Sequence, residues 1–141
     1  MTLNIVKLCV GCDSIDDLVA WQAQNAPRWA PGTAEHITRM WPKREAELLD
    51  GGSLYWVIKG EILCRQRLLG FEERRGADGI ARCGFVLDRD VVRTNAAPRR
   101  AFQGWRYLAA TESPADLAMG RAREEELPPD LARALAEIGL Q

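Results

Sequence analysis

The chain has 141 residues, of which 47% are hydrophobic and 28% are charged, and its formal net charge is -1. This composition is typical of a soluble globular domain and provides no overall positive field that would attract nucleic acid or anionic lipid. No apolar run approaches the roughly 20 residues that a membrane-spanning helix needs. The N-terminal stretch, MTLNIVKLCVGCDS, lacks the basic leader of a signal peptide. We therefore expect one cytoplasmic domain over residues 1–141, with no membrane partner.

The longest continuous apolar run, residues 51–69, predicts the centre of the fold. In its first half, side chains alternate between two faces that are both nearly apolar, which predicts a central strand covered on both sides. Lys59 and Gly60 break the run. In its second half, Ile62, Cys64, Gln66 and Leu68 are expected to share one face of the next strand.

Strand and helix signals also follow one another on the N-terminal side of this centre. Residues 2–10 predict a buried strand, and Ser14 followed by an acid three residues later predicts the start of a helix that ends near Asn25. Residues 35–40 are mostly polar and indicate an edge strand. Residues 42–49 predict a short helix that begins with a proline.

The C-terminal half contains further strand signals separated by turns. We expect the polar residues 72–79 to form a turn, followed by a strand over 80–87 and a short strand at Val91-Val92. Residues 94–98 are expected to form a loop, and 105–108 a strand. An acidic segment, 112–141, is expected to be helical, with helix starts at Ser113-Pro114 and at Pro128. Together the elements predict an α+β domain, a small mixed β-barrel of about six strands with two to four flanking helices.

Four motifs carry a resemblance to a known family: IVKLCVGCDSIDDL, GGSLYWVIKG, CRQRLL and FQGWRYL. Together they resemble a family of uncharacterised bacterial proteins of about 140 residues, a domain of unknown function. The strand order and the YWVIKG hairpin are also similar, more distantly, to the PUA-like barrels, which include the PUA, ASCH and EVE domains. That similarity implies a helix-flanked mixed barrel, here a single PUA-like domain over 1–141, that recognises RNA or modified bases. Some ASCH-like proteins are amidohydrolases of modified nucleosides, which implies Thr38, Lys43 and Glu61 as the corresponding residues here.

Cations and aromatic rings are combined in two segments of the sequence. Cationic side chains can contact phosphates, and flat rings can stack on bases. The alternative is that the rings pack in the core while the arginines are solvated or pair with Glu124 to Glu126. The candidate nucleotide-binding residues are Arg39, Trp41, Lys43, Arg44, Arg99, Arg100, Gln103, Trp105, Arg106 and Tyr107.

The four cysteines have three possible roles. Cys9 and Cys12 form a C-x-x-C, which can bind zinc or carry out thiol chemistry. A zinc site commonly needs a second close pair, and Cys64 and Cys83 lie in separate predicted strands. We therefore expect buried packing thiols and no metal.

The remaining motifs do not identify a catalytic site. His36 is the single histidine, so a metal site with several histidine ligands cannot be built. The sequence contains neither a phosphate-binding loop motif nor a dinucleotide-binding fingerprint. We expect no cofactor, and the catalytic residues are unknown. The interpretation we favour is a module that binds RNA or a nucleotide-like small molecule. A small hydrolase of a nucleoside-like substrate and a protein-interaction module with no small ligand remain as alternatives.

Overall fold

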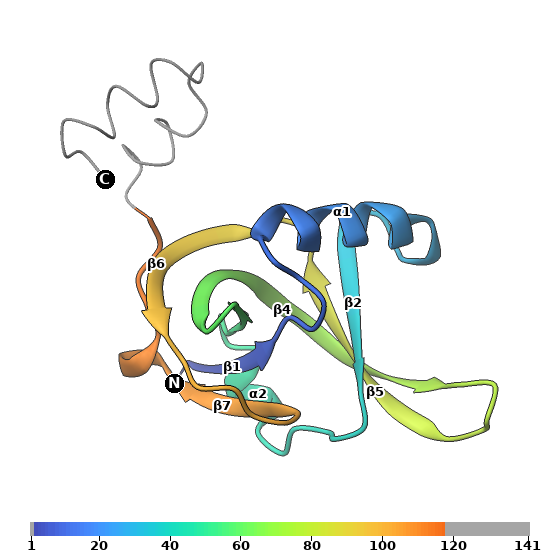
Figure 1. The fold of residues 1–141 in the computed structure, drawn as a ribbon. Coiled ribbons are helices and arrows are strands. Elements are labelled where there is room, and N and C mark those ends of the chain that lie inside the picture. Colours follow the sequence, from blue (N-terminus) through green and yellow to red (C-terminus); the bar gives the residue numbers. More distant parts are fainter. Residues whose placement is uncertain (1, 118–141) are drawn as a thin grey trace, which may run out of the picture.

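Seven strands and two α-helices make up the part of the chain that the computed structural model describes, residues 2–117. The strands form one mixed sheet, and the longer helix crosses one of its faces (Figure 1). The elements are β1 Leu3–Leu8, α1 Ile15–Asn25, the 3-10 turn η1 Ala26–Arg28, β2 Thr33–Thr38, α2 Glu45–Leu48, β3 Ser53–Ile58, β4 Glu61–Arg75, β5 Ala81–Asp88, β6 Val92–Pro98, β7 Trp105–Ala109 and the 3-10 turn η2 Ala110–Glu112.

The strand order is β2-β5-β4-β3-β1-β7, with β6 paired to the first half of β4. β1 and β3 are parallel, and the other pairs are antiparallel. The expected mixed α+β sheet is present, but within residues 2–117 it does not close into a barrel, because β2 pairs only with β5 and β7 only with β1.

The segment that follows β2 contacts β7 through side-chain hydrogen bonds. The Trp105 indole Nε1 donates a hydrogen bond to the Met40 carbonyl at 3.0 Å, and the Lys43 amide donates one to the Tyr107 hydroxyl at 2.9 Å. The chain after β2 thus lies against β7 without pairing with it as a strand.

Strand β3 is central, as its alternating pattern predicts. All six of its residues are buried. Leu54, Trp56 and Ile58 face the larger core cluster, whereas Tyr55 and Val57 face a smaller cluster on the other side of the sheet. The turn into β4 uses Lys59 and Gly60, whose φ angles are 50° and 81°. Glycine adopts such positive φ values without the steric cost that a Cβ brings.

Strand β4 differs from its predicted form in its register. Its register shifts between Ile62 and Cys64, so Ile62 packs in the smaller cluster while Cys64 packs in the larger one. The prediction that these two side chains share one face of the strand is therefore wrong. An extra residue in one strand of a pair reverses the alternation of side chains beyond it.

Two polar segments are strands where a turn or a loop is expected, although the turn around Asp78 and Gly79 is present in shorter form. β4 continues to Arg75, where its polar residues pair with β5. Arg74 also forms an ion pair with Glu35 of β2, with 2.6 Å between Nε and Oε1. Residues 94–98 belong to β6, which pairs with the start of β4. In both places, bonds to distant strands outweigh a weak local strand preference.

Helix α1 starts where its cap predicts, and a polar side-chain network fixes it to the sheet. The Ser14 hydroxyl accepts a hydrogen bond from the Asp17 amide at 3.2 Å. One helical turn beyond Leu18, the buried Gln22 bonds to the buried Gln66 of β4. Leu18 and Gln22 therefore hold α1 across the face of the sheet that carries the larger core cluster.

The C-terminal predictions are tested only in part. Residues 113–117 do not begin a helix, because the Asn95 amide of β6 donates to the Ala115 carbonyl and the Leu117 amide donates to the Arg93 carbonyl. Asp116 adds an ion pair with Arg65 of β4 at 2.7 Å. The rest of the expected acidic helical segment, 118–141, lies outside the described residues. The short helix expected over 42–49 is present but reduced to α2.

Candidate functional site

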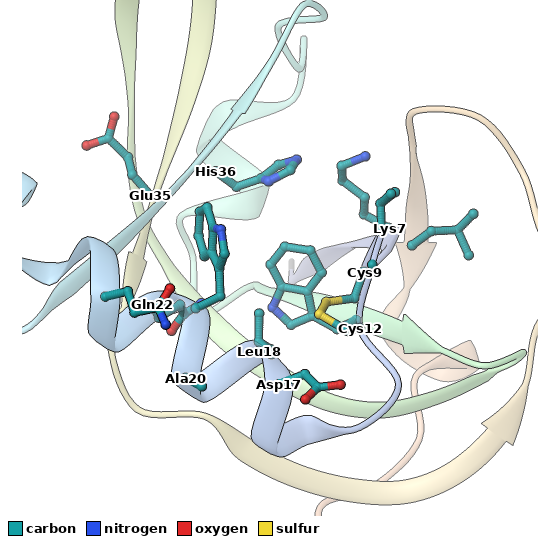
Figure 2. A pocket seen from close by; sticks show the side chains of 15 residues that line it. Lys7, Cys9, Cys12, Asp17, Leu18, Ala20, Gln22, Glu35 and His36 are labelled. Atoms are coloured by element: carbon teal, nitrogen blue, oxygen red, sulfur yellow. A yellow bond between two sulfur atoms is a disulfide. The ribbon is translucent and has the colours of Figure 1, made fainter.

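A cavity of about 500 Å³ lies between helix α1 and the sheet. Its walls come from the end of β1 and the turn after it, from α1, and from β2 and β3 (Figure 2). Its volume falls within the ~300–1,000 Å³ typical of small-molecule sites. The side chains discussed below are Lys7, Cys9, Cys12, Asp17, Trp21, Gln22, Glu35, His36 and Trp56.

Strand alternation explains why polar groups of β1 reach this cavity. Leu3 and Ile5 face the larger core cluster beneath α1, and Lys7 and Cys9 continue the same face of the strand. Both side chains line the cavity between the sheet and α1. Figure 2 shows Lys7 and His36 on the side of the cavity opposite α1.

His36 is the most unusual polar group in the cavity wall. Its ring meets the Trp56 ring edge to face, with 5.4 Å between centroids, and its Nε2 is buried without a hydrogen-bond partner in the described part of the chain. Burial and the nearby positive charge of Lys7 lower the pKa of His36 to about 4. The imidazole is therefore neutral at pH 7 and presents an unsatisfied nitrogen, which is costly unless something binds it.

Lys7 gives the cavity a positive charge. Burial lowers the pKa of its ammonium group, and none of the carboxylates in residues 2–117 pairs with it. Other polar groups in the wall are already engaged. Glu35 pairs with Arg74, and the Asp17 carboxylate accepts a hydrogen bond from the Asp13 amide at 2.8 Å. Lys7 and the His36 Nε2 are thus available to a ligand, and the Asp17 carboxylate keeps further capacity to accept hydrogen bonds.

Two tryptophans supply the aromatic surface. Trp56 of β3 is only 4% exposed and forms part of the inner wall. Trp21 of α1 is 49% exposed, and its ring tilts against Trp29 with 5.7 Å between centroids. A half-exposed indole at a cavity can receive a flat ring by stacking.

The cysteines divide into two classes. Cys9 and Cys12 form a disulfide in the turn after β1, and both line the cavity, so the expectation that they are packing thiols is wrong for this pair. Cys64 and Cys83 are buried free thiols, as expected, and burial raises the pKa of each to about 12. Across residues 2–117, no three His, Cys, Asp or Glu side chains gather as a metal site would require.

The predicted nucleotide-binding residues form two groups on opposite faces of β7. Tyr107 faces the larger cluster, and the Arg44 guanidinium lies 5.6 Å from its ring centroid while pairing with Glu47. The two segments therefore meet at this face through Arg44 and Tyr107. This first group contains Lys43, Arg44, Trp105 and Tyr107, and the predicted residues Arg39 and Trp41 belong to the same segment as Lys43.

The second group lies on the other face, around Phe102. The guanidinium groups of Arg99 and Arg106 lie 5.5 and 5.4 Å from the Phe102 ring centroid. Phe102 packs against the smaller core cluster. Because neighbouring residues of a strand point to opposite faces, Arg106 and Tyr107 cannot contribute to one continuous surface. The second group is Arg99, Arg100, Gln103 and Arg106.

Trp105 does not present its ring to solvent. It is 3% exposed and packs edge to face against Phe85 and Tyr107. An indole enclosed in this way cannot stack on an external base. The alternative interpretation, in which this ring is a core anchor, holds for Trp105.

The residues implied as a hydrolytic set are not brought together. Thr38 is opposite Cys83 of β5, which is itself opposite Glu73 near the end of β4. Glu61 is the first residue of β4. Since a strand rises about 3.3 Å per residue, the length of β4 separates these two side chains.

Sequence reasoning did not identify Lys7, Trp21 or His36 as site residues. One signal was present. Lys7 lies within the apolar run of residues 2–10, on the same face of the predicted strand as Leu3 and Ile5. A lysine on that face is expected to project toward the core unless a cavity receives it. Trp21 at the margin of the apolar stripe of α1 carried no comparable signal.

These features define a mixed-sheet α+β protein with a helix-covered polar cavity. The family described as a protein of unknown function, DUF1489, matches residues 5–141, and the chain belongs to this family. The family membership expected from the four motifs is therefore confirmed. No curated protein and no solved structure matches the chain, so the distant likeness to PUA-like barrels gains no support from these comparisons. Among the described helices, none is long and apolar enough to cross a membrane.

Proposed function

We propose that this protein binds a nucleotide-like ligand whose flat ring enters the cavity beneath α1. The observation that carries the proposal is the buried, unpartnered Nε2 of His36 beside the unpaired ammonium of Lys7. A buried polar nitrogen without a partner lowers stability, and a ligand that supplies the missing hydrogen bond recovers that loss. The site is therefore complementary to a polar ring rather than to a purely apolar molecule.

Lys7 gives the cavity one local binding point for an anionic group, on the side opposite α1 and its Asp17 carboxylate. Lys7 is partly buried, and its nearest titratable neighbour in electrostatic terms, His36, is neutral because its pKa is about 4. A phosphate bound near Lys7 would offset the cost of keeping this ammonium group away from water. A nucleotide combines such an anion with a base that has hydrogen-bonding edges.

The aromatic wall supports a planar ring. Trp21 is half exposed where α1 borders the cavity. Stacking of a base on an aromatic side chain is worth ~1–3 kcal/mol. His36, on the opposite side of the cavity from α1, could then bond to the edge of that base.

Isothermal titration calorimetry with the common ribonucleoside 5′-monophosphates, their base-methylated forms and the corresponding nucleosides tests this proposal. We expect Lys7→Met to weaken monophosphate binding by roughly tenfold, and nucleoside binding much less, because only the former carries the anion. His36→Phe should weaken both. Lys59→Met is the matched control, since Lys59 lies in the β3–β4 turn and pairs with Asp13 at 3.7 Å. Absence of saturable binding of any of these ligands to the wild-type protein would contradict the proposal.

The second arginine group extends the proposal to a nucleotide within an RNA strand. None of the described carboxylates forms an ion pair with Arg99, Arg100 or Arg106. Their charges are thus available to phosphates of an RNA strand that continues onto the face of the sheet opposite the cavity. We expect Arg99→Ala combined with Arg100→Ala to weaken binding of a short single-stranded RNA and to reduce its salt dependence, while mononucleotide affinity stays unchanged. Equal RNA binding by this variant and the wild type, measured by fluorescence anisotropy, would restrict the ligand to free nucleotides.

A further inference from the structure

The turn Cys9-Val10-Gly11-Cys12 joins β1 to the helix that covers the cavity. The Cys12 amide donates a hydrogen bond to the Cys9 carbonyl at 3.3 Å, and Gly11 has a φ of 83°, which suits glycine. The two sulfurs are bonded to each other, and Val10 at the tip is 86% exposed. The disulfide therefore lies in a short surface turn rather than in the core.

We propose that Cys9 and Cys12 form a reversible thiol–disulfide exchange site for low-molecular-weight thiols in the wall of the cavity. This proposal does not depend on the identity of the ligand bound there. It follows from the position of the pair, which small molecules can reach, and from the charges around it.

Accessibility distinguishes this pair from the other cysteines. Cys9 and Cys12 are partly buried and border a cavity large enough to hold a small molecule. Cys64 and Cys83 are each 0% exposed, and burial raises the pKa of both to about 12. Since the thiolate is the reactive form, the two buried thiols remain inert at neutral pH.

Two positive features near the pair favour its thiolate form. Lys7 is two residues before Cys9 on the same face of β1 and lines the same cavity. Helix α1 begins at Ile15, three residues after Cys12, and its N-terminal amides add a partial positive charge. Reduction would therefore release a cysteine sulfur close to these positive features.

The nearby carboxylates oppose this effect only in part. Asp13 pairs with Lys59 at 3.7 Å, and Asp17 accepts the Asp13 amide hydrogen bond. Lys7 has no such acidic partner among residues 2–117. Asp17 keeps its negative charge and lines the same cavity, so Lys7 supplies the positive side chain beside the cysteines and Asp17 the negative one.

The exchange takes place in two balanced steps. The thiolate of a small thiol attacks one sulfur of the Cys9–Cys12 bond, which forms a mixed disulfide and releases the other cysteine as a thiolate. A second small thiol attacks the mixed disulfide and leaves as the oxidised dimer, and the two cysteine sulfurs take up protons. The protein disulfide gains two electrons, and two small thiols lose one electron each.

Equilibration of the full-length protein in glutathione buffers of varied reduced-to-oxidised ratio tests the proposal. Samples are labelled under native conditions with a maleimide and weighed intact. We expect one transition between no label and two labels, with Cys64 and Cys83 labelled only after denaturation. The double variant Cys9→Ser with Cys12→Ser should take up no label in the native state, and circular dichroism checks that it folds.

A second variant isolates the mixed disulfide. Cys12→Ser leaves Cys9 without its partner, so oxidised glutathione should add one glutathione to this variant and none to the double variant. The proposal is overturned if the wild-type disulfide stays intact in excess reduced glutathione. It is equally overturned if both cysteines stay labelled in excess oxidised glutathione, or if Cys12→Ser acquires no adduct.

Discussion

Gln22 of α1 and Gln66 of β4 exchange two side-chain hydrogen bonds, at 2.8 and 2.9 Å, in the interior of the protein. Gln66 also accepts a bond from the Trp56 indole at 2.9 Å and donates one to the Asp88 carbonyl at 3.0 Å. The polar atoms of the Gln66 amide are thus fully engaged. This network fixes the helix over the sheet, and the cavity exists because the helix is held there.

Replacing Gln66 with alanine should therefore destabilise the protein. The change leaves Gln22 and the Trp56 indole without partners in a buried site, and each buried unsatisfied group costs about 1–3 kcal/mol. We expect a loss of about 3 kcal/mol in the free energy of unfolding, measured by urea denaturation. Gln24→Ala on the exposed side of α1 is the control and should change stability by less than about 0.5 kcal/mol. Similar stabilities for the two variants would show that the network is not needed.

The stability contributed by His36 should depend on pH. Its pKa is about 4 in the folded protein and about 6.5 when exposed, so the unfolded state binds more protons between these values. Stability is therefore fully present above about pH 6.5 and is lost as the pH falls toward about 4, by at most about 3 kcal/mol from this residue. Because His36 is the single histidine, NMR can follow its titration directly. A midpoint near 6.5 would contradict the burial of its imidazole.

Gly52 and Gly70 make a matched pair for testing backbone packing. A Cβ at Gly52 would overlap the carbonyl oxygens of Leu3 and Leu48, whereas a Cβ at Gly70 meets nothing within 4 Å. We expect Gly52→Ala to cost more than about 2 kcal/mol, because the backbone of β1 and of α2 would have to move apart. Gly70→Ala should be neutral or slightly stabilising. Thermal unfolding of both variants measures the difference, and equal midpoints would argue against close contact at Gly52.

Trp105 and Arg106 are neighbours in sequence but should respond very differently to substitution. Trp105→Ala removes a buried ring that contacts Phe85 and is expected to cost about 3–5 kcal/mol. Arg106→Ala changes an exposed side chain over Phe102 and should change the free energy of unfolding by less than about 0.5 kcal/mol. Urea denaturation of both variants checks this. A small effect at Trp105 would mean that its ring is free to move outward.

The sequence predicts the regular strands well and the site poorly. The two apolar faces of β3 follow directly from alternation, and the Ser14 cap predicts the start of α1. The length of β4 could not be predicted, because its polar end is a strand only through pairing with β5 and through the Arg74–Glu35 ion pair. Such long-range pairing leaves no local pattern.

The candidate site was missed for a related reason. Its residues come from four separate elements, and no motif of fixed spacing links Lys7, Trp21, His36 and Trp56. The arginine and aromatic segments were more visible in the sequence because their residues are adjacent. Adjacency in a strand, however, places consecutive side chains on opposite faces, as Arg106 and Tyr107 show.

The pairing of β1 with β7 has a consequence for synthesis of the chain. Leu3 of β1 is opposite Ala109 of β7. Strand β1 leaves the ribosome first, and it can pair with β7 only after the last described strand has been synthesised. Until then β1 has a free edge, and such edges recruit strands from other molecules. A nascent or truncated chain that ends before residue 105 therefore exposes this edge and lacks the indole that fills the core beside it, and we expect it to require a chaperone or to aggregate.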